Sequence, residues 1–198
     1  VIGTVSIAIG AALVGTFTFL RKQALVGDAI AHSILPGVCF AFILSGVKDP
    51  LYLIIGAFVS GWLSVLLIEW VSSNTKLKPD TAIAFVLTFF FAVGAMMLSY
   101  IQNSGNAAQS GLDEFLFGKA AAIGKDDIWI FASIGIVLVV MIVLFFRTFK
   151  LISFNRDFAK SLGMKVRVHE MVLSSLTVLS IASGIQAVGV VLMAALLI

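Results

Sequence analysis

Charge-poor apolar runs of about 20 residues recur along the whole chain, and each is long enough to cross the ~30 Å hydrocarbon layer of a bilayer. Of the 198 residues, 61% are apolar and only 12% are charged, whereas soluble domains average about 25% charged residues. Soluble helices would need polar faces, and these runs have almost none. The sequence therefore predicts an all-α polytopic membrane protein built as a helical bundle.

The apolar runs predict six to seven membrane helices in one transmembrane domain over 1–198. The expected helices are 1–20, 29–47, 50–71, 81–101, 128–146 and an apolar stretch from 171 to the end. That last stretch exceeds one crossing, and the segment SGIQAVG at 183–189 predicts a break, a turn and the start of a seventh helix. Because the chain begins at Val1 and stops inside an apolar run, we expect both ends to be truncated.

Lysine and arginine are distributed unevenly between the two sides of the predicted bundle. With residue 1 outside, ten of the 13 fall on the inner side, as cytoplasmic loops require. The inner group is Arg21, Lys22, Lys76, Lys78, Arg147, Lys150, Arg156, Lys160, Lys165 and Arg167; the outer group is Lys48, Lys119 and Lys125. This predicts a cytoplasmic loop at about 147–168 and an outer loop at about 102–127. A net charge of +3, carried mainly by loops, gives no reason to expect a nucleic-acid partner, so lipid is the expected surrounding.

The second apolar run carries two ionisable residues, Asp28 and His32, in LRKQALVGDAIAHSILPGVCFAF at 20–42. A rise of ~1.5 Å per residue places Asp28 roughly 10 Å and His32 roughly 15 Å beyond the basic pair Arg21–Lys22. The two residues lie four apart and so share one helical face near the bilayer midplane. A lone charge at that depth costs about 2.5–3.5 kcal/mol on insertion scales, which favours a functional role.

Two interpretations of this pair stay open. Asp28 and His32 could hydrogen-bond each other and a neighbouring helix as a structural clasp. Alternatively, a carboxylate oxygen and a neutral imidazole nitrogen suit manganese, iron or zinc. Two ligands are too few to hold such an ion, but a second copy across a homodimer axis would supply two carboxylates and two imidazoles.

Three further residues bear on this path. Pro36 cannot donate to the carbonyl of His32, so a kink is expected just beyond the pair. Cys39 is either a small apolar filler or an additional soft ligand. Gln186 is expected to make an interhelical hydrogen bond, with lining of the path as the alternative.

The predicted cytoplasmic loop contains a short amphipathic helix. Within SFNRDFAKSLGMKVRVHE at 153–170, Phe158 and Leu162 lie on one face and Gly163 is a stop signal. Such a helix could lie on the membrane surface or dock in a groove of a soluble partner.

These segments together resemble the permease subunits of ABC importers of the manganese/zinc/iron family. The resemblance rests on LRKQALVGDAIAHSILPGV, DTAIAFVLTFFFAVGAMMLS, LDEFLFGKAAAIGKDDI, SFNRDFAKSLGM and IQAVGVVLMAALLI, in order along the chain. It implies an eight-helix permease that forms a homodimer in the bacterial plasma membrane. It also implies cytoplasmic ATP-binding ATPase subunits and an extracytoplasmic metal-binding protein as partners.

The resemblance assigns roles to particular residues. Asp28 and His32 match the pair that lines the metal path, while segment 154–164 matches the coupling helix that rests on the ATPase. The expected coupling residues are Phe154, Asp157, Phe158, Ala159, Leu162 and Gly163. In AIAHSILPG, Ala31 replaces the serine of the common family form, and the LPG ending favours manganese over zinc; zinc or iron come next as expected cargo. The divalent metal is then a transported substrate, and no permanently bound cofactor is expected.

Other function classes remain as alternatives. A secondary metal-ion transporter or channel would need no ATPase, but it typically carries coupling-ion carboxylates in paired broken helices. An intramembrane metallohydrolase needs three protein ligands, which Asp28 and His32 do not supply. No Gly-x-x-x-x-Gly-Lys-Ser/Thr loop is present, so the chain is expected not to be an enzyme, and ATP hydrolysis is expected in a separate chain.

Overall fold

The computed structural model describes residues 2–21, 24–46, 49–103, 125–189 and 193. The described part is helical and contains no strand, as the hydropathy pattern predicts. In chain order the helices are α1 Ile2–Leu20, α2 Ala24–Ser33, α3 Leu35–Ser45, α4 Pro50–Asn74, α5 Pro79–Asn103, α7 Lys125–Phe154, α8 Arg156–Ser161 and α9 Val166–Val188.

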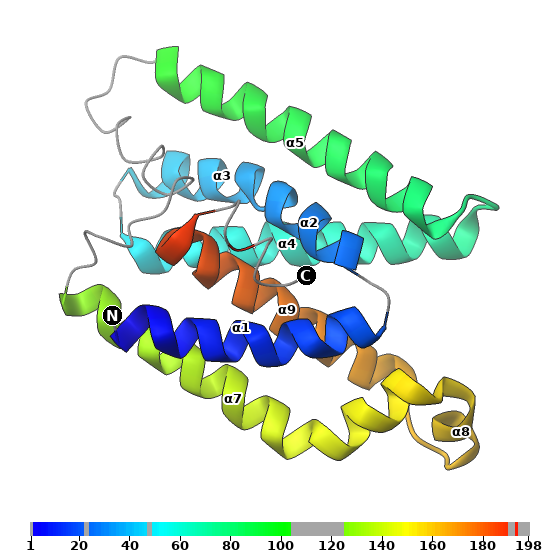
Figure 1. The fold of residues 1–198 in the computed structure, drawn as a ribbon. Helices are drawn as coiled ribbons and strands as arrows, with labels where there is room; N and C mark the ends of the chain where they lie inside the picture. Colours follow the sequence, from blue (N-terminus) through cyan, green and yellow to red (C-terminus); the bar gives the residue numbers. More distant parts are fainter. Residues whose placement is uncertain (1, 22–23, 47–48, 104–124, 190–192, 194–198) are drawn as a thin grey trace.

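The long helices form a bundle around α9 (Figure 1). Helix α9 packs against α1, α4, α7 and α2, whereas α5 lies on one outer side against α2 and α3, and α7 lies on the other against α1. Within the most apolar stretch of each helix, 67% of α9 is buried but only 17% of α5 and 22% of α7. The outer helices therefore leave apolar faces for lipid or for another chain.

Five segments are long and apolar enough to span a membrane, and Val5–Leu20 is a shorter apolar helix. The spans are Leu25–Ser45, Pro50–Asn74, Pro79–Asn103, Ile128–Phe154 and Val166–Val188. Together with α1 they correspond to the six predicted helices. The predicted seventh helix and most of the outer loop at about 102–127, including Asp113 and Glu114, lie outside the described residues.

Several predicted helix ends are wrong. The second span begins at Ala24 rather than 29, so Asp28 lies inside it, because an aspartate does not by itself end a helix whose other face is apolar. Helix α7 continues to Phe154 rather than 146, since its exposed Arg147 and Lys150 can extend their charges toward water without ending the helix. The loop predicted to be cytoplasmic is therefore shorter than 147–168, with Phe154 on α7, and α9 begins at Val166 rather than 171.

The predicted break at 183–189 is also wrong over most of its length. Helix α9 continues to Val188 and ends at Gly189, which has φ of 87°. The Ser183 hydroxyl donates to the carbonyls of Leu179 and Ser180, so this polar residue is satisfied within the helix. Gly184 packs closely against Met193, whose side chain would have to move to admit a Cβ at this position.

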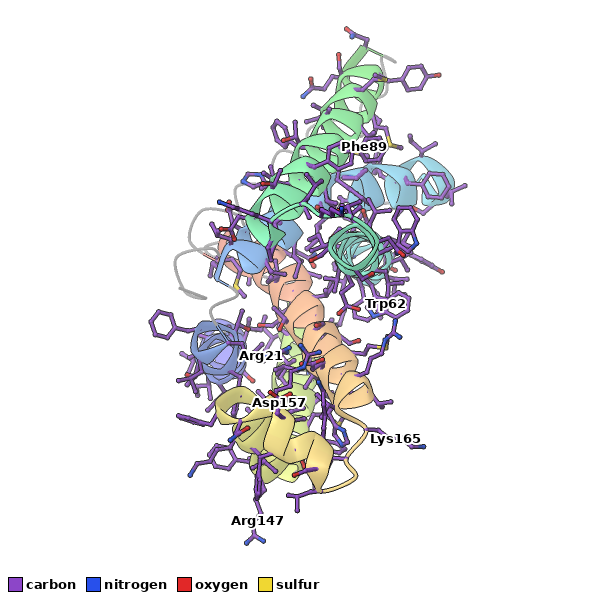
Figure 2. All side chains as sticks on the ribbon, turned by 90° about the vertical axis from the view of Figure 1, so that its right-hand side faces the viewer. Arg21, Trp62, Phe89, Arg147, Asp157 and Lys165 are labelled. Carbon is purple, nitrogen blue, oxygen red and sulfur yellow. The ribbon has the colours of Figure 1, made fainter. Side chains whose placement is uncertain are left out.

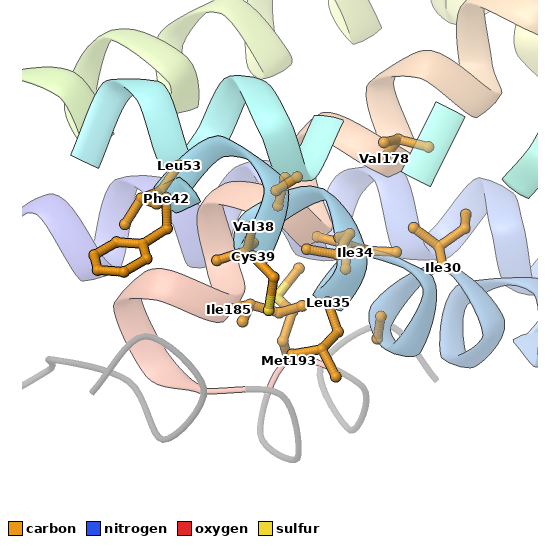
Figure 3. Packing of buried hydrophobic residues seen from close by; sticks show 14 of the residues in the cluster. Ile30, Ile34, Leu35, Val38, Cys39, Phe42, Leu53, Val178, Ile185 and Met193 are labelled. Carbon is orange, nitrogen blue, oxygen red and sulfur yellow. The ribbon is translucent and has the colours of Figure 1, made fainter. Parts of the chain in front are cut away.

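The second span is interrupted at Ile34, between α2 and α3, as Pro36 predicts. Beyond it, α3 crosses α4 at very close range. Gly37 and Gly56 allow this approach, since a Cβ on either residue would collide with the opposite helix. Figure 3 shows the core beside this crossing, where residues of α2 and α3 pack against α9. The cluster includes Ile30, Ile34, Val38, Cys39, Val178, Ile185 and Met193. The face of α2 opposite this core is left for Asp28 and His32.

One end of the bundle gathers the connections that the charge bias assigns to the cytoplasm. The end of α1, the start of α2, the α4–α5 connection and α8 all lie at the right of Figure 1. Figure 2 views the molecule from this end, where Arg21, Arg147, Asp157 and Lys165 are seen near α8. Successive connections between the spans therefore lie at opposite ends of the bundle, as the predicted topology requires.

Candidate metal-binding pair and cytoplasmic loop

Asp28 and His32 lie one turn apart on α2, and the distance from His32 Nε2 to Asp28 Oδ1 is 3.7 Å. This distance is longer than a hydrogen bond, so the Asp28 oxygen and the His32 nitrogen both stay available to another partner. The His32 side chain is 36% exposed and the Asp28 side chain 43%. The pair therefore presents oxygen and nitrogen atoms to the outside of this one chain.

The rest of α2 explains this orientation. Ala29 packs against Ile68, Ile83 and Val86, and Ile30 packs into the central core, so two faces of α2 are held by apolar burial. The His32 ring meets the ring of Phe91 on α5 edge to face, with 5.5 Å between centroids. The aromatic contact fixes one side of the imidazole while the pair stays accessible.

The described residues around the pair supply no further strong ligand. Among the described residues, no group of three or more His, Cys, Asp or Glu could hold a metal ion. No hydrogen bond joins Asp28 or His32 to a neighbouring helix in that part of the chain, which the structural clasp would require. Within the described residues, Asp28 and His32 are therefore two candidate ligands, an incomplete set for a divalent transition metal.

Cys39 and Gln186 do not join this pair in the described chain. Cys39 is fully buried in the central core and its thiol lies 4.0 Å from the Gly94 carbonyl, as expected of a small apolar filler. Gln186 is buried near the end of α9, and its Oε1 has no hydrogen-bond partner within the described residues. The interhelical hydrogen bond expected of Gln186 is therefore not found at that atom.

The predicted amphipathic helix exists as α8, and its ends are set by local signals. The Asn155 side chain accepts a hydrogen bond of 3.0 Å from the backbone N–H of Phe158, which caps the first turn. At the other end Gly163 has φ of 76°, and the N–H groups of Gly163 and Met164 donate to the carbonyls of Lys160 and Ala159. These two bonds form a Schellman motif, so Gly163 ends the helix as predicted.

Helix α8 is anchored by one residue and displays others. Ala159 is fully buried against Ile152 and Val166, whereas Phe158 and Leu162 are exposed. Phe154 is exposed at the end of α7, and Asp157 is exposed in the first turn of α8. Of the predicted coupling residues, Phe154, Phe158 and Leu162 thus expose apolar side chains and Asp157 exposes a carboxylate, and both membrane contact and protein docking remain open as their use.

Sequence reasoning missed an ion bridge beside α8. Glu170 accepts from Arg21 Nη2 at 3.0 Å through Oε1 and from Arg156 Nη2 at 2.8 Å through Oε2. Burial lowers the pKa of Arg21, and the charge of Glu170 opposes that shift. The three residues come from α8, α9 and the end of α1, so no local pattern in the sequence could have indicated the bridge.

The chain is similar to known proteins over its whole length. The ABC 3 transport family (ABC-3) matches residues 1–198. The chain is 45% identical over 99% of its length to the manganese transport system membrane protein MntC of Bacillus subtilis, and 39% identical over its full length to the zinc transport system membrane protein TroC of Treponema pallidum. It covers 45% and 66% of those two proteins, and thus less than two thirds of either.

A solved structure shares the fold. PsaBC from Streptococcus pneumoniae, determined in complex with Fab, superposes with a TM-score of 0.84 at 34% sequence identity. The match covers 100% of this chain and 68% of that chain. The arrangement of the described helices is therefore that of a known membrane-protein fold.

Proposed function

Because the chain belongs to the ABC 3 transport family, we propose that it is the transmembrane permease subunit of an ATP-driven importer of divalent transition-metal ions. Manganese is the favoured cargo, followed by zinc and iron. The relatives described above are named for manganese and zinc transport, which supports this cargo class. The observation that carries the proposal is the accessible Asp28–His32 pair inside a membrane span.

The metal path runs past Asp28 and His32 at a homodimer axis. A carboxylate and an imidazole suit manganese, iron and zinc, and two copies would supply four side-chain ligands. The exposed faces of the pair and of α5 support an apposed second chain at this position. Alternating access then requires the two copies to separate on one side of the membrane at a time, so that the ion is never in an open pore.

ATP hydrolysis is assigned to separate cytoplasmic subunits that dock on α8. The exposed Phe158 and Leu162 suit a groove on a soluble partner, and the buried Ala159 fixes α8 to α7 and α9. An extracytoplasmic metal-binding protein would deliver the ion to the opposite face. The chain as a whole serves as one permease domain, with the α8 segment as its coupling loop.

The test is metal uptake by the complete transporter carrying Asp28→Asn or His32→Ala. Each change should lower uptake of manganese, zinc or iron by roughly tenfold or more, since it removes a direct ligand and even outer-shell changes cost 10–100-fold. Protein level in the membrane should not fall, because removing a midplane charge eases insertion. Asp80→Asn, at the exposed start of α5, is the matched control. Normal uptake by both variants would refute the metal path.

A further inference from the structure

Glu170 holds three helical elements together at the cytoplasmic end of the bundle. It lies in the first turns of α9, its partner Arg21 follows the last residue of α1, and its partner Arg156 is the first residue of α8. The two carboxylate oxygens are used separately, one for each guanidinium. The Glu170 and Arg21 side chains are only 11% and 14% exposed, whereas Arg156 is 59% exposed.

The bridge differs from the other ion pair on this loop. Lys160 and Asp157 are 3.4 Å apart, but both belong to α8, so that pair connects nothing beyond one helix. Glu170 instead joins residues that are 149 and 14 positions away in the chain. Charge-assisted hydrogen bonds of this length are stronger and more directional than neutral ones. The bridge therefore ties α8 to Glu170 of α9 and to Arg21 at the end of α1.

Arg21 also lies beside α2. It lines a small cavity of about 10 Å³ together with Val26 and Ile30 of α2 and with Thr177 of α9. Arg21 also precedes Asp28 by seven positions in the chain. Within the described residues, the bridge is thus a polar connection from α8 to the end of α1. The next helix in the chain, α2, carries the candidate ligands Asp28 and His32.

We propose that the Arg21–Glu170–Arg156 bridge couples movement of α8 to the position of α2, and so links ATP hydrolysis to opening of the metal path. The proposal rests on the proposed function and deepens it. Glu170, Arg21 and Arg156 act as positioning residues, since none of them contacts the metal ligands. Breaking the bridge uncouples the two activities, and docking of the ATPase on α8 remains.

The experiment compares metal transported per ATP hydrolysed in proteoliposomes that contain the complete transporter. Glu170→Gln and Arg156→Gln should keep the ATPase bound and hydrolysing ATP, while the ratio of metal to ATP falls severalfold. Arg156→Lys, which keeps the charge, should restore most of the ratio. Arg167→Gln is the matched control, because Arg167 is exposed in the first turn of α9, the helix that carries Glu170.

Several outcomes separate coupling from a merely structural role. If Glu170→Gln only lowers the amount of folded protein, the exposed Arg156→Gln decides, and an unchanged ratio of metal to ATP in that variant overturns the proposal. An unchanged ratio in both variants overturns it as well.

A second readout does not depend on the cargo. Spin labels at Ser161→Cys on α8 and Leu25→Cys on α2, in a Cys39→Ala background, report the distance between these helices. ATP should change this distance in the otherwise wild-type complex but not with Glu170→Gln. If the wild-type complex took up no metal, the proposed function would fail, and the spin-label distances alone would decide the coupling. An equal ATP-driven change in the wild-type and Glu170→Gln complexes overturns the coupling proposal.

Discussion

At the scale of single residues, the interruption of the second span is stabilised by a side chain from another helix. Pro36 has no backbone N–H, and its ring crowds the carbonyl of His32. One residue further on, the Ser33 carbonyl accepts a hydrogen bond of 2.6 Å from the Ser60 hydroxyl of α4. An unsatisfied carbonyl in hydrocarbon would cost several kcal/mol, so Ser60 helps the span to bend directly beside Asp28 and His32.

We expect Ser60→Ala to lower the free energy of unfolding by about 0.6–1.7 kcal/mol, the range for interhelical hydrogen bonds in membrane proteins. The change keeps the Cβ that packs against Gly37 and removes only the hydroxyl. Unfolding in detergent measures it. Ser73→Ala is the control, because the exposed Ser73 donates within its own helix to the Trp70 carbonyl. Equal stability of the two variants would show that the bond to Ser33 contributes nothing.

At the scale of helices, the sequence predicts the spans because membrane crossing requires long apolar runs. The C-terminal end of α8 was also predicted, since Gly163 acts on its own neighbours. The sequence did not predict the end of α7 at Phe154, because long charged side chains let a helix continue into water. It also did not predict that α9 continues past Ser183, because a helix tolerates a serine whose hydroxyl bonds to a carbonyl of the preceding turn. The role of Glu170 depends on partners brought close only by the fold.

The exposed face of α8 gives a prediction at this scale. Phe158→Glu and Leu162→Glu should abolish co-purification of the ATPase and ATP-dependent uptake, because each puts a charge into an apolar contact. Membrane insertion should be unchanged, since both side chains are exposed in this chain. Val168→Glu, at an exposed apolar position on α9, is the control. Normal co-purification and uptake by both α8 variants would instead place this face on the membrane surface.

At the scale of the whole molecule, the chain is a multi-pass protein of the bacterial plasma membrane, with buried central helices and two apolar outer sides. One outer side carries α5, which exposes large apolar residues along its length and contacts His32 through Phe91. These exposed residues are Phe85, Phe89, Phe91, Met96 and Tyr100. The opposite outer side carries α7, whose exposed residues are mainly aliphatic, such as Val143 and Leu144. Among the described residues, the first side combines an apolar surface with two candidate ligands, so we expect a second copy to complete a metal site there.

A homodimer axis on this side predicts that the two His32 residues lie close together. A shared ion would hold ligand atoms from both copies at roughly 2.0–2.2 Å, so the two α2 helices must approach each other there. In a Cys39→Ala background, His32→Cys should crosslink to its twin in the membrane with an oxidant or a short thiol reagent, giving a dimer band on a denaturing gel. Val143→Cys, on α7, should remain monomeric under the same conditions. Efficient crosslinking at Val143 without any at His32 would place the interface on the other side of the bundle and leave Asp28 and His32 facing lipid, where two ligands from one chain cannot hold the ion.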